Sequence, residues 1–215
     1  MKSVLRGTIL LLVTLMLVTG CSKEQSVDLN GTVVDPPFVP ASDVLRTTDG
    51  SPYALTKDTT AALTLVFFGY THCPDICPAV LASISSGLAK LTAAQRKQVD
   101  VLFVTSDPKR DTGPVMRSYL DRFDPGYIGL TGDLTAIARV GKSVGVFVDE
   151  GAALADGGYD PNSHSAYVIG INAHHVAPIF WGGDTAPSQF ANDIRFLLTE
   201  KPEKLKAATT GSATN

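Results

Sequence analysis

Two cysteines four residues apart, Cys73 and Cys77, are the residues of this chain best placed to do chemistry. They lie in the segment GYTHCPDICP (69–78), which directly follows the apolar run 63–68. That run is typical of a buried strand, and the apolar periodicity over 79–91 predicts a helix. The positive end of a helix dipole stabilises thiolates, so this position favours a reactive or metal-binding pair of sulfurs.

The spacing of the two cysteines bears on whether they form a disulfide or bind a metal. At positions i and i+4 of a helix, two Cβ atoms lie about 5–6 Å apart, whereas a disulfide prefers about 3.5–4.5 Å. A soft metal ion bound by both sulfurs spans the wider gap with less local adjustment. We therefore expect Cys73 and Cys77 to form a metal site that can also oxidise to a redox-active disulfide.

The third cysteine, Cys21, follows a segment with the composition of a secretory signal. A basic start precedes an apolar run of 11 residues, Thr8 to Val18, which is shorter than the roughly 20 residues that span a bilayer. A cysteine directly after VTG (18–20) resembles a bacterial lipobox, which predicts removal of residues 1–20 and lipidation of Cys21. An ordinary signal peptide with an incidental cysteine is the alternative.

A lipidated Cys21 would anchor the chain to the outer face of the cell membrane, in an extracytoplasmic compartment. That compartment is oxidising, so reduced thiols there need a metal or a reducing partner. The formal net charge of the 215-residue chain is −3, and no basic stripe with interleaved aromatic residues is present. This charge pattern argues against nucleic acid as a partner.

Composition divides the rest of the chain. The polar segment 21–43 carries three prolines, which is typical of a tether between a membrane anchor and a domain. Residues 44–200 are enough for one domain with its own core, and the end of the chain, 201–215, is expected to be a disordered tail. Apolar runs within the domain predict strands at 63–68, 101–105, 146–148, 166–171 and 176–181, and helical periodicity predicts helices at 79–91, 113–123, 134–144 and 187–199.

Helices and strands that alternate first, followed by a strand pair and a closing helix, predict an α/β sandwich with a central mixed β-sheet flanked by helices. A strand, a cysteine motif and a helix in that order also open thioredoxin-like domains. Three motifs then closely resemble the SCO/SenC family: GYTHCPDICP (69–78), TSDPKRDT (105–112) and SHS (163–165). The resemblance covers most of the segment 55–198.

That resemblance implies a thioredoxin-like fold and a copper ion, Cu(I) or Cu(II), bound by Cys73, Cys77 and His164. It also implies delivery of copper to the copper-centre subunit of cytochrome c oxidase during assembly. We expect another copper chaperone or a thiol reductant as a further partner. In the segment TSDPKRDT (105–112), the aspartate that the resemblance marks as functional is Asp107, and Asp111 lies in the same segment.

The residues themselves suit copper, because two thiolates and an imidazole form a soft ligand set with room to hand the ion on. Zinc is the close alternative, since two cysteines, one histidine and an open position also describe some zinc sites. Asp107 precedes Pro108 and can cap a helix, or it can hydrogen-bond a metal ligand and orient it; we expect Asp111 to share that supporting role. His72 is expected to be exposed and to point away from the metal.

Two functions remain open. The first is a non-enzymatic metallochaperone. The second is a thiol-disulfide oxidoreductase that keeps the oxidase copper-site cysteines reduced. Disulfide exchange requires no distant imidazole, so a role for His164 favours the first.

Overall fold

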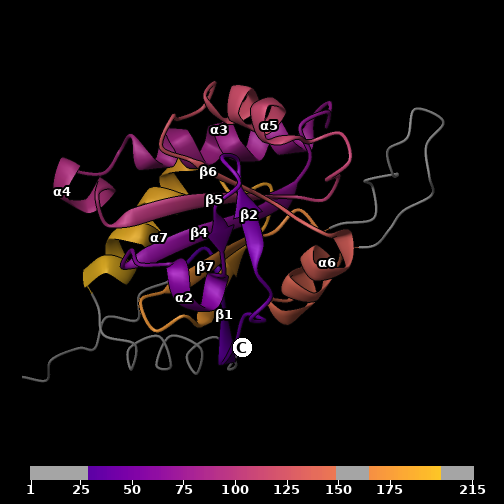
Figure 1. Cartoon of the computed structure of the whole chain (residues 1–215). Helices are drawn as coiled ribbons and strands as arrows, with labels where there is room; N and C mark the ends of the chain where they lie inside the picture. The colour runs from indigo at the N-terminus through magenta and orange to yellow at the C-terminus, as the bar shows by residue number, and fades with distance from the viewer. Residues whose placement is uncertain (1–28, 149–164, 200–215) are drawn as a thin grey trace, which may run out of the picture.

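Eight strands form one central sheet in the computed structural model, which describes residues 29–148 and 165–199 (Figure 1). The sheet order is β1-β8-β7-β4-β5-β6-β2-β3. Strands β4, β5 and β6 are parallel, and every other pairing is antiparallel. The strands are β1 (Thr32–Phe38), β2 (Leu45–Thr47), β3 (Pro52–Tyr53), β4 (Leu63–Gly69), β5 (Val99–Thr105), β6 (Ile128–Thr131), β7 (Val168–Asn172) and β8 (Ala177–Trp181).

Helices cover both faces of this sheet, because alternate side chains of the buried strands point to opposite faces. Leu65 and Phe67 of β4 join a core with α3, α5 and α7, while Val66 and Phe68 join a second core with α6. Figure 1 shows α3 and α5 on one side of the sheet and α6 on the other. The helices are α2 (Leu55–Asp58), α3 (Ile76–Leu88), α4 (Ala93–Arg96), α5 (Gly113–Leu120), α6 (Leu134–Ser143) and α7 (Pro187–Thr199).

The parallel pair β4 and β5 brings two sequence motifs together. The strands are in register from Leu63 opposite Val99 to Gly69 opposite Thr105, so both end at the same edge of the sheet. The backbone N–H of Ser106 donates to the carbonyl of Gly69 at 2.7 Å, which joins the two segments just beyond the strands. The cysteine segment and the aspartate segment therefore begin side by side.

The mixed sheet flanked by helices confirms the fold class expected from the sequence. One predicted element is wrong: residues 146–148 form no strand, although the side chains of Val146 and Val148 are buried in the core beside α6. The helix expected at 79–91 begins three residues earlier, at Ile76.

The segment 21–43, expected to be a tether, also differs in part. Its residues 32–38 form β1, which pairs with β8 at the edge of the sheet. Residues 1–28 lie outside the described part of the chain, and so does Cys21. Within 29–148 and 165–199, no helix is both long and apolar enough to cross a bilayer.

Candidate metal centre

The sulfur of Cys73 lies at the open N-terminus of α3. The backbone N–H of Cys77, in the first turn of that helix, donates to Cys73 Sγ at 3.3 Å. The N-cap position belongs to Asp75, whose side chain makes no capping hydrogen bond. The Cys73 sulfur satisfies one of the N–H groups that a helix start leaves without partners.

Both cysteines are free thiols and both are buried: Cys73 is 8% exposed and Cys77 is fully enclosed. The sulfur of Cys77 lies against the last residue of β4. A Cβ added at Gly69 would stand 2.9 Å from Cys77 Sγ and 3.0 Å from the ring of Phe103. Only glycine leaves room for the sulfur at this point, so the strand end and the helix start are matched to each other.

The two thiols have opposite pKa shifts. Burial raises the pKa of Cys73, but backbone N–H groups of Cys77 and Asp75 and the hydroxyl of Tyr70 stabilise its thiolate, so the net pKa is lowered. Burial dominates at Cys77 and raises its pKa, although the backbone of Tyr70 acts against it. Cys73 is thus the thiol prepared for ionisation.

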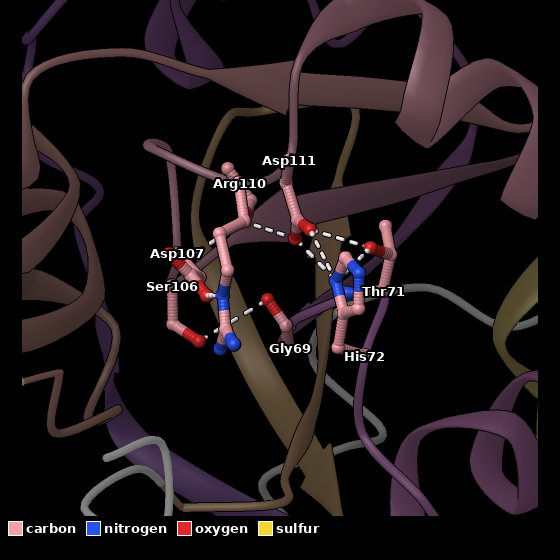
Figure 2. Close-up of polar contacts among 8 residues, drawn as sticks. Gly69, Thr71, His72, Ser106, Asp107, Arg110 and Asp111 are labelled. Atoms are coloured by element: carbon pink, nitrogen blue, oxygen red, sulfur yellow. Dashed lines mark hydrogen bonds and ion pairs between the residues drawn. The ribbon is translucent and has the colours of Figure 1, made fainter. Parts of the chain in front are cut away.

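Asp111 is buried beneath the cysteine loop, which it ties to the end of β5 (Figure 2). Its Oδ2 accepts hydrogen bonds from the backbone N–H of Thr71 at 3.0 Å and from the hydroxyl of Thr105 at 2.7 Å. Its Oδ1 accepts from the hydroxyl of Thr71 at 2.5 Å. Burial raises the pKa of Asp111, and these three donors oppose that effect. Asp111 thus holds the cysteine loop against the end of β5, and its role in orienting a metal ligand stays a prediction.

Asp107 is also fully buried, and its Oδ2 pairs with the guanidinium of Arg110 (Figure 2). Its Oδ1 has no hydrogen-bond partner among the described residues. Asp107 caps no helix: its carbonyl accepts from the backbone N–H of Asp111 in a turn, and α5 begins later, after Thr112. A buried carboxylate oxygen without a donor can accept a hydrogen bond from a further group.

His164 falls outside the described residues, as does Cys21. Within the described ranges, no group of three or more His, Cys, Asp or Glu side chains is arranged to hold a metal ion. The three histidines that the structure describes lie in two places. His72 is largely exposed beside Cys73, while His174 and His175 lie in the β7–β8 turn, where His175 Nδ1 is 2.9 Å from the Thr59 hydroxyl.

Sequence reasoning did not single out three side chains of this centre: Tyr70, Thr71 and Thr105. The hydroxyl of Tyr70 hydrogen-bonds the Cys73 sulfur, and the two threonines hold Asp111. The only feature of the sequence that could have pointed to these three residues is their position inside the motifs 69–78 and 105–112. The parallel register of β4 and β5 is what brings them into contact.

Comparison with known proteins finds a matching family model and relatives of similar sequence. The family model described as SCO1/SenC matches residues 44–199. A bovine mitochondrial protein described as an SCO2 homologue is 41% identical over 132 residues, which are 61% of this chain and 49% of the relative.

Two solved structures share the fold. Apo Sco1 from Thermus thermophilus is 28% identical with a TM-score of 0.69, and the match covers 79% of this chain and 97% of that one. Copper-bound ScoI from Bradyrhizobium japonicum is 31% identical with a TM-score of 0.63, covering 74% of this chain and 99% of that one. The chain spans about half the length of the mitochondrial relatives it matches.

Proposed function

Because this chain belongs to the SCO1/SenC family, we propose that it is an extracytoplasmic copper metallochaperone that delivers copper to the copper centre of cytochrome c oxidase. One observation carries the proposal: two free thiols, Cys73 and Cys77, meet at the start of α3, and the backbone N–H of one donates to the sulfur of the other. Thiolates are the soft donors that copper prefers. The copper-bound state of the Bradyrhizobium relative supports this assignment.

The third ligand that we propose is His164. The described chain resumes at residue 165 and enters β7, whose Val168 pairs with Phe67, two residues before the end of β4. This topology returns the chain to the edge of the sheet at which the cysteine loop begins. The free Oδ1 of Asp107 is an acceptor at the same edge, and metal-binding histidines commonly donate their second ring N–H to such a carboxylate.

The different pKa values of the two thiols favour a second function, thiol-disulfide exchange. Cys73, with its lowered pKa, would attack a disulfide of the target and release one target thiol. Cys77 would then attack the mixed disulfide, release the second target thiol and leave a Cys73–Cys77 disulfide. A thiol reductant would restore the pair. In this proposal the same cysteines reduce the oxidase copper-site cysteines before copper is delivered.

We also propose the setting. Lipidation at Cys21 would hold the domain at the outer face of the cell membrane. Residues 1–20 would be the signal, and the residues before β1 the tether. Another copper chaperone or a thiol reductant would meet the same edge of the sheet, and nucleic acid is not among the expected partners.

Anaerobic copper titration of the reduced protein, followed by absorption spectroscopy, tests the ligand set. We expect one copper ion per chain, thiolate-to-Cu(II) charge-transfer bands, and loss of tight binding in Cys73→Ser and in Cys77→Ser. The matched control is Cys21→Ser, which removes a cysteine outside the motif and should bind like the wild type. Stoichiometric tight binding by the double serine variant would move the site elsewhere, with His174 and His175 the first candidates. Preferential retention of zinc in competition would overturn copper as the ion.

A further inference from the structure

His72 combines an exposed imidazole with a fixed ring nitrogen. Its side chain is 55% exposed, whereas the neighbouring Cys73 is buried. The ring Nδ1 lies 3.0 Å from the hydroxyl of Thr71 and 3.7 Å from Oδ1 of Asp111 (Figure 2). The same imidazole lines a pocket of about 240 Å³ between the cysteine loop and α5.

The hydrogen bonds around Thr71 determine which nitrogen of His72 carries the proton. A hydroxyl has one hydrogen to donate, and the 2.5 Å bond commits that hydrogen to Asp111 Oδ1. The other oxygen of Asp111 already accepts from two donors. Thr71 Oγ1 can therefore only accept from His72, so Nδ1 of the neutral imidazole bears the hydrogen. The lone pair of the ring is left on Nε2.

A histidine fixed in this way has the arrangement seen at metal sites, where one ring nitrogen donates toward a carboxylate network and the other binds the ion. His72 is also the more accessible donor. An ion that approaches from solvent reaches the exposed imidazole more readily than the buried cysteines Cys73 and Cys77.

We propose that His72 Nε2 is a transient copper ligand that receives the ion from its donor and passes it to Cys73. This inference rests on the proposed copper function. The step is a ligand exchange in which no electron moves and the oxidation state of copper is unchanged. Nε2 supplies an electron pair as a ligand of the donor leaves. The Cys73 sulfur, once its proton has passed to solvent, then replaces Nε2.

Stopped-flow transfer from the Cu(I)–bicinchoninate complex to the reduced full-length protein tests the proposal under anaerobic conditions. We expect His72→Gln to slow transfer about tenfold, while the final amount of bound copper stays the same because both sulfurs remain. The matched control is His174→Gln, which removes an exposed imidazole from the β7–β8 turn and should transfer copper at the wild-type rate. Thr71→Val should slow transfer as well, because the tautomer is then no longer fixed.

A second measurement does not depend on copper. Long-range ¹H–¹⁵N spectra of the apo protein should show His72 as the Nδ1–H tautomer, and Thr71→Val should lose that preference. Wild-type transfer rates in His72→Gln, or an Nε2–H tautomer in the wild type, would overturn this inference and leave the copper function standing. Failure of the wild-type protein to take up copper at all would overturn both.

Discussion

The carboxylate of Asp193 accepts a hydrogen bond of 2.8 Å from the indole N–H of Trp181, so α7 is joined to β8 on the buried face of the sheet. The same oxygen accepts from the backbone N–H of Gly31 at 2.8 Å, and the other accepts from the side chain of Asn30 at 2.8 Å. Asp193 thereby holds the chain that enters β1 against the domain.

Removing the Asp193 carboxylate should weaken the fold without touching the cysteines. Asp193→Ala leaves buried donors on Trp181 and Gly31 without an acceptor, and each such loss costs about 1–3 kcal/mol. We expect the free energy of unfolding in urea to fall by about 3 kcal/mol. The exposed neighbour Asn192, replaced by alanine, is the control and should change stability little. A loss below about 1 kcal/mol in Asp193→Ala would show that water replaces the carboxylate.

The opposite pKa shifts of Cys73 and Cys77 predict which cysteine reacts first. Iodoacetamide should modify Cys73 before Cys77 in the reduced protein near neutral pH, because the pKa of Cys73 is lowered and that of Cys77 is raised. The rate at Cys73 should decline as the pH falls through its pKa and the thiolate is lost. Peptide mapping by mass spectrometry measures both rates.

Serine variants provide the controls for this reaction. Cys77→Ser keeps the backbone N–H that donates to the Cys73 sulfur, so Cys73 should remain reactive in it. Faster modification of Cys77 than of Cys73 in the wild type would contradict the assignment of Cys73 as the ionisable thiol.

Asp111 predicts a pH dependence of stability whose sign follows from its raised pKa. Burial raises the pKa of this carboxyl in the folded state. At a pH between the unfolded and the folded pKa, the folded protein therefore binds a proton that the unfolded chain does not. The contribution is present below the unfolded pKa, about 3.9, and is lost as the pH rises through the folded pKa. The stability of the wild type relative to Asp111→Asn should therefore increase between pH 7 and pH 4.5.

Urea unfolding of both proteins at the two pH values checks this prediction. Asparagine is nearly isosteric with aspartate and does not titrate, so the difference between the two proteins isolates Asp111. Thr105→Val is a useful companion, since it removes one donor to the carboxylate and should raise the pKa of Asp111 further. If the free energy of unfolding of the wild type relative to Asp111→Asn instead falls between pH 7 and pH 4.5, the three hydrogen-bond donors lower the pKa of Asp111 by more than burial raises it.

The central features of this fold were predictable because their signals are local. The run 63–68 is continuously apolar and leads into the cysteine segment, and β4 with α3 forms there. Edge strands are harder to predict from the sequence. Strand β1 contains Pro36 and Pro37, which suggested a linker, yet an edge strand can accommodate prolines because one of its sides needs no partner. Its pairing with β8 joins residues far apart in the chain.

Residues 146–148 show the converse error. Valines alternate with Phe147 there as they would in a strand, but the two valines are buried by contacts in the core beside α6 and not by a ladder. The roles of the aspartates were similarly out of reach. The hydrogen bond that ties Asp111 to the cysteine loop comes from Thr71, which is 40 residues away in sequence. Only the register of β4 and β5 decides it.

Cys21→Ser should separate anchoring from folding. If Cys21 carries the lipid, the variant should leave the membrane fraction or accumulate as unprocessed precursor, because its thiol is the attachment point. The folded domain should be unaffected, since Cys21 precedes β1. Cell fractionation measures the first effect and thermal unfolding the second. Cys73→Ser is the control and should stay with the membrane; an unchanged distribution of Cys21→Ser would remove the lipid anchor.

His164→Ala should distinguish the two proposed functions. A thiol-disulfide exchanger needs only Cys73, Cys77 and a lowered thiol pKa, so disulfide exchange should continue nearly unchanged in this variant. A copper chaperone has a different requirement, because Cu(I) is satisfied by two thiolates whereas Cu(II) prefers more ligands, with nitrogen among them. We therefore expect Cu(II) binding to weaken far more than Cu(I) binding. Oxidase activity should also fall in cells that carry only the variant.

Affinities for both ions, together with oxidase activity, decide between these outcomes. His174→Ala is the matched control, since it removes an exposed imidazole from the β7–β8 turn and should leave both ions bound as in the wild type. Unchanged Cu(II) spectra and full oxidase assembly in His164→Ala would exclude this histidine from the site. In that case the unequal pKa values of Cys73 and Cys77 would make thiol-disulfide exchange the better account of the motif.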